Sequence, residues 1–157
     1  MTRMFTRQSK DEPEAPATYA NNRFALNVPA DWQDQSFFRF EGPDQGGVKH
    51  HINVVIDSDV KTDDLQHYAE MQLQALQTEL RSFTLLKRGE VTLASGAPAY
   101  ELVYRWIPVK DKELIQQVYL VLVPGRGYIL TTSFSAATWT TLGPSIESVL
   151  KSFAPIA

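Results

Sequence analysis

Alternating apolar and polar positions run through most of the chain and are interrupted by one long helical pattern. Short alternating segments predict strands at residues 23–28, 36–40 and 51–56. After a further candidate at 83–91, longer segments predict strands at 98–107, 113–123 and 128–134. Glycine and proline residues separate these segments and predict a loop at 42–47 and a turn at 124–127.

Helical spacing is clearest between residues 62 and 81. Apolar side chains recur there every three or four positions and form one stripe, made of Leu65, Tyr68, Ala69, Leu73, Leu76 and Leu80. Thr62 can cap the free backbone N–H groups, and the two aspartates that follow suit the positive end of a helix. A second helix is predicted near the C-terminus, with Pro144 in its first turn.

From residue 23 onward these elements follow the order β-β-β-α-β-β-β-β-α. Short connections between successive strands favour an antiparallel sheet, so the predicted class is α+β, with both helices packed on one face. Residues 1–22 are polar, carry two prolines and predict a mostly disordered arm. The remainder, 23–157, is predicted to form a single domain.

Two of the predicted strands are apolar on both faces. In the strand at 36–40, alternation places Phe38 and Phe40 on one face and Phe37 and Arg39 on the other. The strand at 113–123 is largely apolar on both sides, apart from the glutamines at 116 and 117. If both helices cover the same face, the far face must close onto itself, dimerise or receive an apolar partner, because monomers rarely expose large apolar patches.

Composition removes several classes of function. The chain of 157 residues is long enough for one domain with a core. Its net charge of -3 provides neither the basic surface that binds nucleic acid nor a patch for anionic lipid. The absence of cysteine excludes disulfides, thiol nucleophiles and cysteine-ligated zinc. No segment approaches the roughly 20 apolar residues of a membrane span, so no direct membrane insertion is expected. The N-terminus lacks a secretory signal pattern, and the expected compartment is the cytoplasm.

Familiar catalytic and ligand-binding motifs are also missing from the sequence. The glycine-rich run at 42–47 lacks the Lys-Ser/Thr of a P-loop, and no GxGxxG occurs. His50 and His51 are neighbours on a predicted strand, so they point to opposite faces and do not suit one metal ion. We therefore expect no enzyme, no metal and no cofactor. An alternative hypothesis keeps a small-ligand or hydrolytic site in a cleft near Trp32 and Trp106.

Several motifs, taken in order, resemble the DcrB/Eag-like domain family. The segment from Phe24 to Ser36, F-x-L-x-V-P-x-D-W-Q-D-Q-S, resembles the opening of the family. Residues 64–69 with Leu73 resemble its central helix, and 96–102 resemble its G-x-P-A-Y strand. Segments 117–119 and 127–131 resemble the two strands that follow, and 150–153 resemble the closing L-x-S-F. The resemblance covers about residues 22–154 of the chain.

This resemblance implies a PsbP-like (Mog/PsbP) fold and a function without catalysis. The run from Trp32 to Ser36 is closer to the Eag branch, whose members are chaperones of type VI secretion. They hold the apolar N-terminal transmembrane segments of Rhs or PAAR-linked effectors in the cytoplasm before export. The implied client-binding residues are Phe37, Arg39, Val54, Val55, Gln117 and Tyr119. Among them, Arg39 stands where the branch usually has an aliphatic residue.

A second hypothesis needs no client. The chain could be a homodimeric structural or interaction module, whose second apolar face is its self-interface. The partner is then another copy of the same chain instead of an effector protein with apolar N-terminal helices.

Overall fold

The structure is a computed structural model that describes residues 2–4, 17–20 and 24–156. The chain divides into two compact units, Met1–Gln35 and Ser36–Ala157. The first unit holds a three-stranded antiparallel sheet in the order β1-β2-β3, formed by β1 (Thr2–Met4), β2 (Ala17–Ala20) and β3 (Ala25–Val28). The sequence predicted a mostly disordered arm at 1–22, and the two short strands β1 and β2 lie within it. Residues 1, 5–16 and 21–22 of that arm lie outside the described residues.

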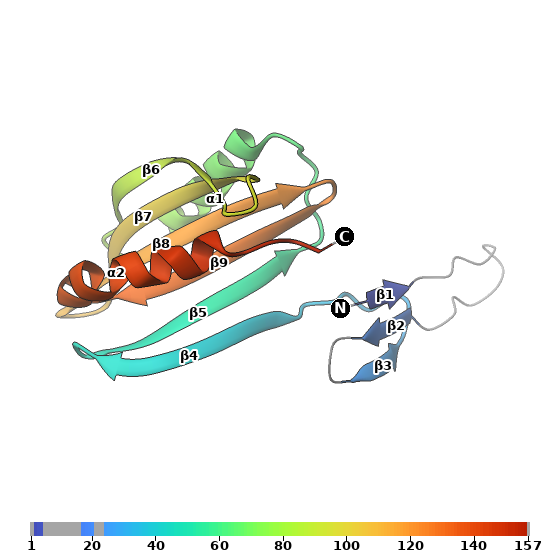
Figure 1. The fold of residues 1–157 in the computed structure, drawn as a ribbon, viewed down its shortest axis with the longest axis horizontal. Helices are drawn as coiled ribbons and strands as arrows, with labels where there is room; N and C mark the ends of the chain where they lie inside the picture. The colour runs from blue at the N-terminus through green and yellow to red at the C-terminus, as the bar shows by residue number, and fades with distance from the viewer. Residues whose placement is uncertain (1, 5–16, 21–23, 157) are drawn as a thin grey trace. The chain divides into compact units, whose positions relative to one another are not determined.

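The second unit is a six-stranded antiparallel sheet with two helices (Figure 1). Its elements are β4 (Phe37–Gln45), β5 (Val48–Asp57), α1 (Leu65–Glu79), β6 (Thr84–Thr92), β7 (Pro98–Val109), β8 (Lys112–Val123), β9 (Arg126–Phe134) and α2 (Ala136–Lys151). The strands lie in the order β4-β5-β9-β8-β7-β6. From β3 onward, the predicted order of elements and the antiparallel α+β class are confirmed.

The two helices pack on opposite faces of the sheet, so the prediction that both share one face is wrong. Helix α1 packs on a cluster that includes Leu102 and Val118, whereas α2 packs through Leu150 on a cluster that includes Tyr119. Leu102 pairs with Val118, and Val118 and Tyr119 are consecutive on β8, so these clusters lie on opposite faces. Figure 1 shows α2 in front of the sheet and α1 behind it. We call the two surfaces the α1 face and the α2 face.

The connections explain this arrangement. Helix α1 joins β5, near one edge of the sheet, to β6 at the other edge, and it contacts β7 and β8 on the way. Helix α2 follows β9 and contacts β8 and β9. Strands β7 and β8 are apolar on both sides and therefore need a cover on both faces, which one helix on each face provides.

The helix starts depend on side-chain caps. Asp64 is the N-cap of α1 and accepts hydrogen bonds from the backbone N–H groups of residues 66 and 67. Thr62, the predicted cap, instead accepts from the backbone N–H of Asp64. Helix α2 begins at Ala136 with a capping box between Ser135 and Thr138. Pro144 therefore lies inside this helix, and its predicted place in the first turn is wrong.

Strands β4 and β5 form a longer hairpin than predicted. The expected loop at 42–47 reduces to a turn at Gly46 and Gly47, whose φ angles of 60° and 76° require residues that tolerate the left-handed region. Gly42 and Pro43 belong to β4, where the register shifts between Glu41 and Asp44 in a bulge. Strand β4 therefore extends beyond the predicted 36–40, and the strand order places it at the edge of the sheet.

Candidate functional site

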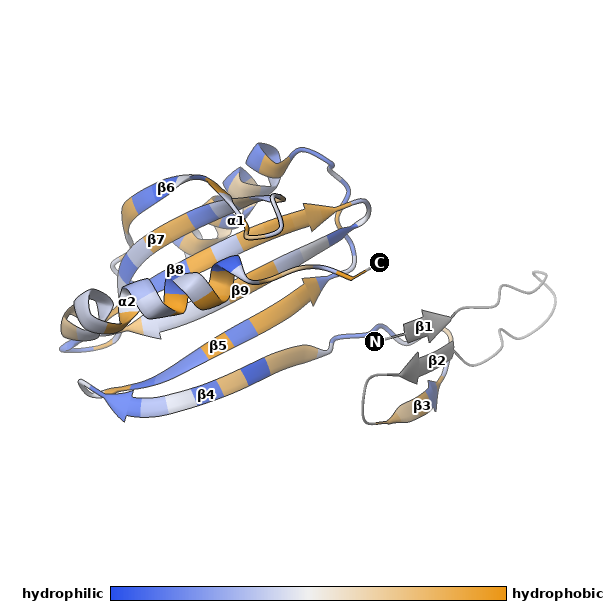
Figure 2. Cartoon of the chain, viewed as in Figure 1, coloured by the Kyte–Doolittle hydropathy of each residue, from blue (hydrophilic) through white to orange (hydrophobic). Residues whose placement is uncertain are grey.

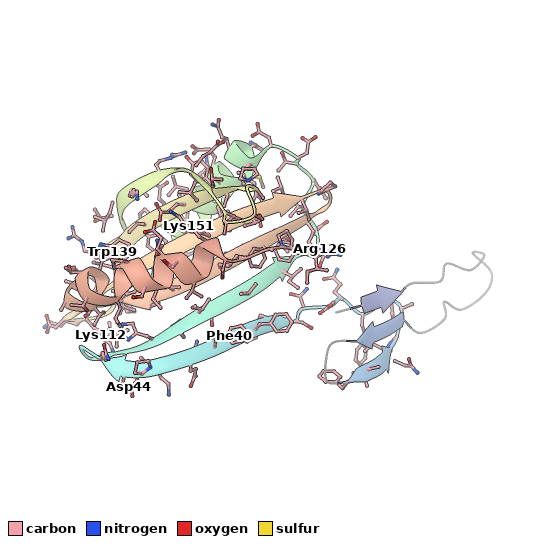
Figure 3. All side chains as sticks on the ribbon, in the orientation of Figure 1. Phe40, Asp44, Lys112, Arg126, Trp139 and Lys151 are labelled. Carbon is pink, nitrogen blue, oxygen red and sulfur yellow. The ribbon has the colours of Figure 1, made fainter. Side chains whose placement is uncertain are left out.

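A groove opens on the α2 face between the β4–β5 hairpin and α2. It encloses a cavity of about 250 Å³. Its apolar lining comes from strands and helix alike, namely Phe40, Ile52, Phe134, Leu142 and Ile146. Phe40, marked on β4 in Figure 3, keeps 63% of its surface exposed although it lines this cavity. The groove thus offers water-accessible apolar surface next to a closed core.

The hairpin tip is fixed to the start of α2 by buried polar contacts. His50 lies 3.2 Å through Nδ1 from the carbonyl oxygen of Pro43 and 3.0 Å through Nε2 from Oγ1 of Thr138. A Cβ on Gly46 would lie 2.8 Å from Oγ of Ser135, so only glycine allows this close approach. The residues that cap α2, Ser135 and Thr138, therefore also contact the hairpin tip. The groove extends from this junction between the hairpin and α2.

Helix α2 also covers a polar cluster in the middle of its face. Gln117 donates from Nε2 to Oε2 of Glu101 over 2.8 Å, and both side chains are almost fully buried. Lys87 reaches the other carboxylate oxygen of Glu101 from the surface, with 2.9 Å between Nζ and Oε1. The hydrogen bond to Glu101 raises the pKa of Lys87 above its usual 10.5. Tyr119 lies 3.5 Å through its hydroxyl from Oε1 of Glu147 on α2, and burial raises the pKa of this tyrosine.

The structure divides the six predicted client-binding residues between the two faces. Phe37, Arg39 and Val55 lie on the α1 face, whereas Val54, Gln117 and Tyr119 lie on the α2 face, as the cross-strand pairs of the sheet require. Gln117 and Tyr119 are only 1% and 0% exposed, so neither offers surface to a client in this structure. The six residues therefore do not form one groove.

The α1 face carries a second apolar surface that no described helix covers. Phe37 pairs with Val55, and Val55 pairs with Ile129, so the three side chains form a row across β4, β5 and β9. Phe37 is 62% exposed and Val55 is 40% exposed. Ile129 packs against the cluster beneath α1, whereas Phe37 and Val55, on the two strands near the edge, stay exposed.

Arg39 has partners on the α1 face and does not enter the groove. Its Nε lies 3.0 Å from Oε1 of Glu41, and its guanidinium also donates to Oδ1 of Asn53 over 3.4 Å. Arg39, whose charge did not suit the predicted apolar client site, thus forms a solvent-exposed ion pair with Glu41.

Sequence reasoning missed the groove residues themselves. Phe40 and Ile52 were detectable, because alternation along β4 and β5 is plain in the sequence and in Figure 2. Leu142 and Ile146 gave no such signal, since the proximity of α2 to the hairpin depends on the order of strands in the sheet.

Two chemical features can be assessed for the part of the chain that the structure describes. Within 2–4, 17–20 and 24–156, no group of three or more histidine, aspartate or glutamate side chains is placed to hold a metal ion. Neither described helix is long and apolar enough to cross a membrane. Trp32 belongs to the first unit and Trp106 to the second, and the idea of a cleft near both stays a hypothesis.

The fold is shared with two solved structures. It matches the crystal structure of PA94 from Pseudomonas aeruginosa, described as a protein of unknown function and candidate regulator. The TM-score is 0.76 at 22% identity, and the match covers 91% of this chain and 99% of that chain. It also matches the solution structure of CyanoP, the PsbP protein of Synechocystis sp. PCC 6803, with a TM-score of 0.53 at 13% identity, covering 96% and 98% of the two chains. The protein therefore has a PsbP-like α+β fold, as predicted.

Sequence comparison assigns the family. The DcrB family profile matches residues 25–152, and no curated protein sequence matches the chain. This protein belongs to the DcrB family, which confirms the resemblance found in its motifs.

Proposed function

We propose that this protein is a non-enzymatic chaperone or adaptor that acts in the cytoplasm. Its client is an effector of type VI secretion, of the Rhs or PAAR type, whose apolar transmembrane helices it binds before export. The observation that carries the proposal is the open groove on the α2 face, with Phe40 at its exposed edge. Membership of the DcrB family and the Eag-like run from Trp32 to Ser36 support it.

The physical task of such a chaperone is to remove apolar surface from water. A transmembrane helix exposes an area on the order of 1,000 Å², and burial contributes about 25 cal/mol per Å² before the entropic costs of association. Aliphatic and aromatic residues line the groove together with a few polar ones, such as His50 and Thr132. Binding of this kind requires shape and apolar contact, and it requires no catalytic group.

A peptide-binding measurement tests the proposal directly. The probe is a fluorescently labelled helix of about 20 leucine and alanine residues with lysines at both ends, the length that spans a bilayer. We expect the full chain to bind it and Phe40→Asp to bind at least about tenfold more weakly, because a carboxylate would be desolvated in the groove.

Two matched variants decide where the probe binds. Leu86→Asp changes an apolar residue that is 45% exposed on the other edge strand, and it should bind like the wild type. Phe37→Asp alters the α1 face at an exposure similar to that of Phe40, and it should also retain binding. Loss of binding in Phe37→Asp alone would move the site to the α1 face, and a wild-type chain that binds no peptide would refute the function.

The client-free hypothesis has one observation in its favour. Strand β4 is an edge of the six-stranded sheet and exposes two phenylalanines, so it suits a contact between copies. A homodimer does not compete with a client if the two uses employ different parts of β4.

A further inference from the structure

The tip of the β4–β5 hairpin extends beyond the backbone ladder that joins it to the rest of the sheet. The described pairs between β5 and β9 run from Ile52 to Asp57. Closer to the tip, side chains fix the hairpin, and Val48 and His50 are only 8% and 5% exposed. The position of this part of the hairpin therefore depends on side-chain contacts.

Two of these contacts join the tip to the start of α2. His50 lies 3.2 Å through Nδ1 from the carbonyl oxygen of Pro43 and 3.0 Å through Nε2 from Oγ1 of Thr138. A carbonyl oxygen only accepts, so Nδ1 carries the proton, and in the neutral ring Nε2 accepts from the Thr138 hydroxyl. At Gly46 an added Cβ would lie 2.8 Å from Oγ of Ser135 and 3.0 Å from Cγ2 of Thr138. The first contact keeps the hairpin from moving away from α2, and the second keeps it from moving closer.

The groove lies between the two elements that this junction connects. Phe40 and His50 line it from the hairpin, and Leu142 and Ile146 line it from α2. Because each side of the groove belongs to one of the joined elements, the separation at the junction determines the separation of the walls. We propose that the contacts of Gly46 and His50 with the start of α2 set the width of the groove. His50 is thereby a positioning residue for the apolar group that enters.

This width admits one large apolar side chain. The cavity of about 250 Å³ lies between the roughly 150 Å³ that holds benzene and the roughly 300–1,000 Å³ of sites for drug-sized ligands. Two of its polar side chains are already engaged, since His50 has the partners given above and Thr132 donates from Oγ1 to the carbonyl oxygen of Gln117. An occupant therefore gains mainly from apolar contact and fit. Selection of client side chains by size follows, and this consequence rests on the proposed function.

A matched pair of glycine variants tests the width. Gly46 and Gly47 have φ angles of 60° and 76°, so alanine strains the turn at either position. A Cβ on Gly46 meets α2, whereas one on Gly47 would have nothing within 4 Å. Oγ of Ser135 cannot turn away without losing its hydrogen bond from the backbone N–H of Thr138, which caps the helix. Gly46→Ala should therefore push the hairpin away from α2 and widen the groove, and Gly47→Ala should not.

Two small probes measure the width without a client. Para-fluorotoluene and fluoroindole represent the side chains of phenylalanine and tryptophan, and fluorine NMR follows their titration into the full chain. We expect the wild type to bind both in the millimolar range. Gly46→Ala should shift the ratio of the two dissociation constants by at least about threefold in favour of fluoroindole, and Gly47→Ala should keep the wild-type ratio. Partial unfolding alone would weaken both probes alike and leave the ratio unchanged.

Two substitutions of His50 test its positioning role and also carry the test if Gly46→Ala does not fold. His50→Gln places an amide near the former Nε2 and can keep the contact with Thr138. His50→Asn places an amide near the former Nδ1 and can keep only the contact with Pro43. Each loses one hydrogen bond, so their stability should fall by similar amounts. The probe ratio should stay near the wild-type value in His50→Gln and shift towards fluoroindole in His50→Asn, because only the latter releases the hairpin from α2.

The outcomes separate this inference from the proposed function. A wild type that binds neither probe, an equal ratio in the two glycine variants, or an equal shift in the two His50 variants would each overturn the width-setting junction. A wild type that binds the leucine-alanine peptide while the probe ratio stays constant in every variant contradicts the junction and leaves the chaperone function in place. Ratios that shift as expected in a chain that binds no peptide do the opposite.

Discussion

The centre of the sheet and its β4–β5 hairpin are built from similar residues and have different surroundings. On β7, Leu102 on the α1 face and Val103 on the α2 face are 0% and 2% exposed. On β4, Phe37 on the α1 face and Phe40 on the α2 face are 62% and 63% exposed. Both strands carry apolar side chains on both faces, but only the central strand has a helix over each of them.

Because of this difference, the centre of the sheet and the hairpin are expected to have different roles. Buried apolar side chains in the centre stabilise the fold, because their removal opens cavities in a close-packed interior. The exposed phenylalanines of the hairpin contribute little to the stability of one copy and remain available for contacts with other molecules. Substitutions in the two regions should therefore separate stability from binding.

The largest expected effect comes from truncation in the centre. Leu102→Ala should lower the free energy of unfolding by about 2–5 kcal/mol, because it leaves a cavity between β7 and α1. Phe40→Ala should lower it by less than about 1 kcal/mol, since the ring is mostly exposed. Urea unfolding at one protein concentration measures both. A loss for Phe40→Ala as large as that for Leu102→Ala would show that the hairpin is part of the stabilising core.

The sequence was sufficient to predict the strands and helices, but it did not show which face of the sheet each helix covers. Alternation and helical spacing gave the order of strands and helices from β3 onward, because these patterns are local. They could not reveal that α1 and α2 lie on opposite faces, which depends on where β5, β6 and β9 stand in the sheet. The apolar residues on both sides of the strand at 113–123 were the signal that each face of the sheet is covered by a helix.

An intermediate effect is expected from the polar cluster under α2. Lys87→Met should destabilise the protein by about 1–3 kcal/mol, because the buried carboxyl of Glu101 then loses its ion pair and retains only Gln117 among its described side-chain partners. The double variant with Glu101→Gln should recover part of this loss, since the buried charge is gone. Thermal unfolding of the four proteins measures the coupling, and equal losses for the single and double variants would contradict it.

The pH dependence of this pair has a definite sign. The ion pair raises the pKa of Lys87 above 10.5, so its contribution to stability is fully present at neutral pH. The contribution is lost as the pH rises through the raised pKa. The stability difference between the wild type and Lys87→Met should therefore shrink in strongly alkaline solution.

The candidate site was less predictable than the fold, as one pair of neighbours and one buried glutamine show. Val54 and Val55 are consecutive on β5, so they could not both face one groove, and the structure places them on opposite faces. Gln117 was expected to anchor a client, but α2 begins eight residues before Pro144 and covers it. The capping box at Ser135 and Thr138 was the local signal for that earlier start.

The smallest expected effect concerns the junction between the two regions. His50→Leu removes a contact with Pro43 inside the hairpin and a contact with Thr138 on α2, and it should cost about 1 kcal/mol, the typical net value of such hydrogen bonds. His51→Leu is the matched control, because His51 contacts only the Lys49 carbonyl among its described hydrogen-bond partners. Hydrogen exchange should become faster in β4 for His50→Leu and stay unchanged in β8, since local opening affects the hairpin alone. Faster exchange throughout the sheet would mean that the hairpin and the centre open together, and the contrast between a stabilising centre and a separable binding edge would then fail.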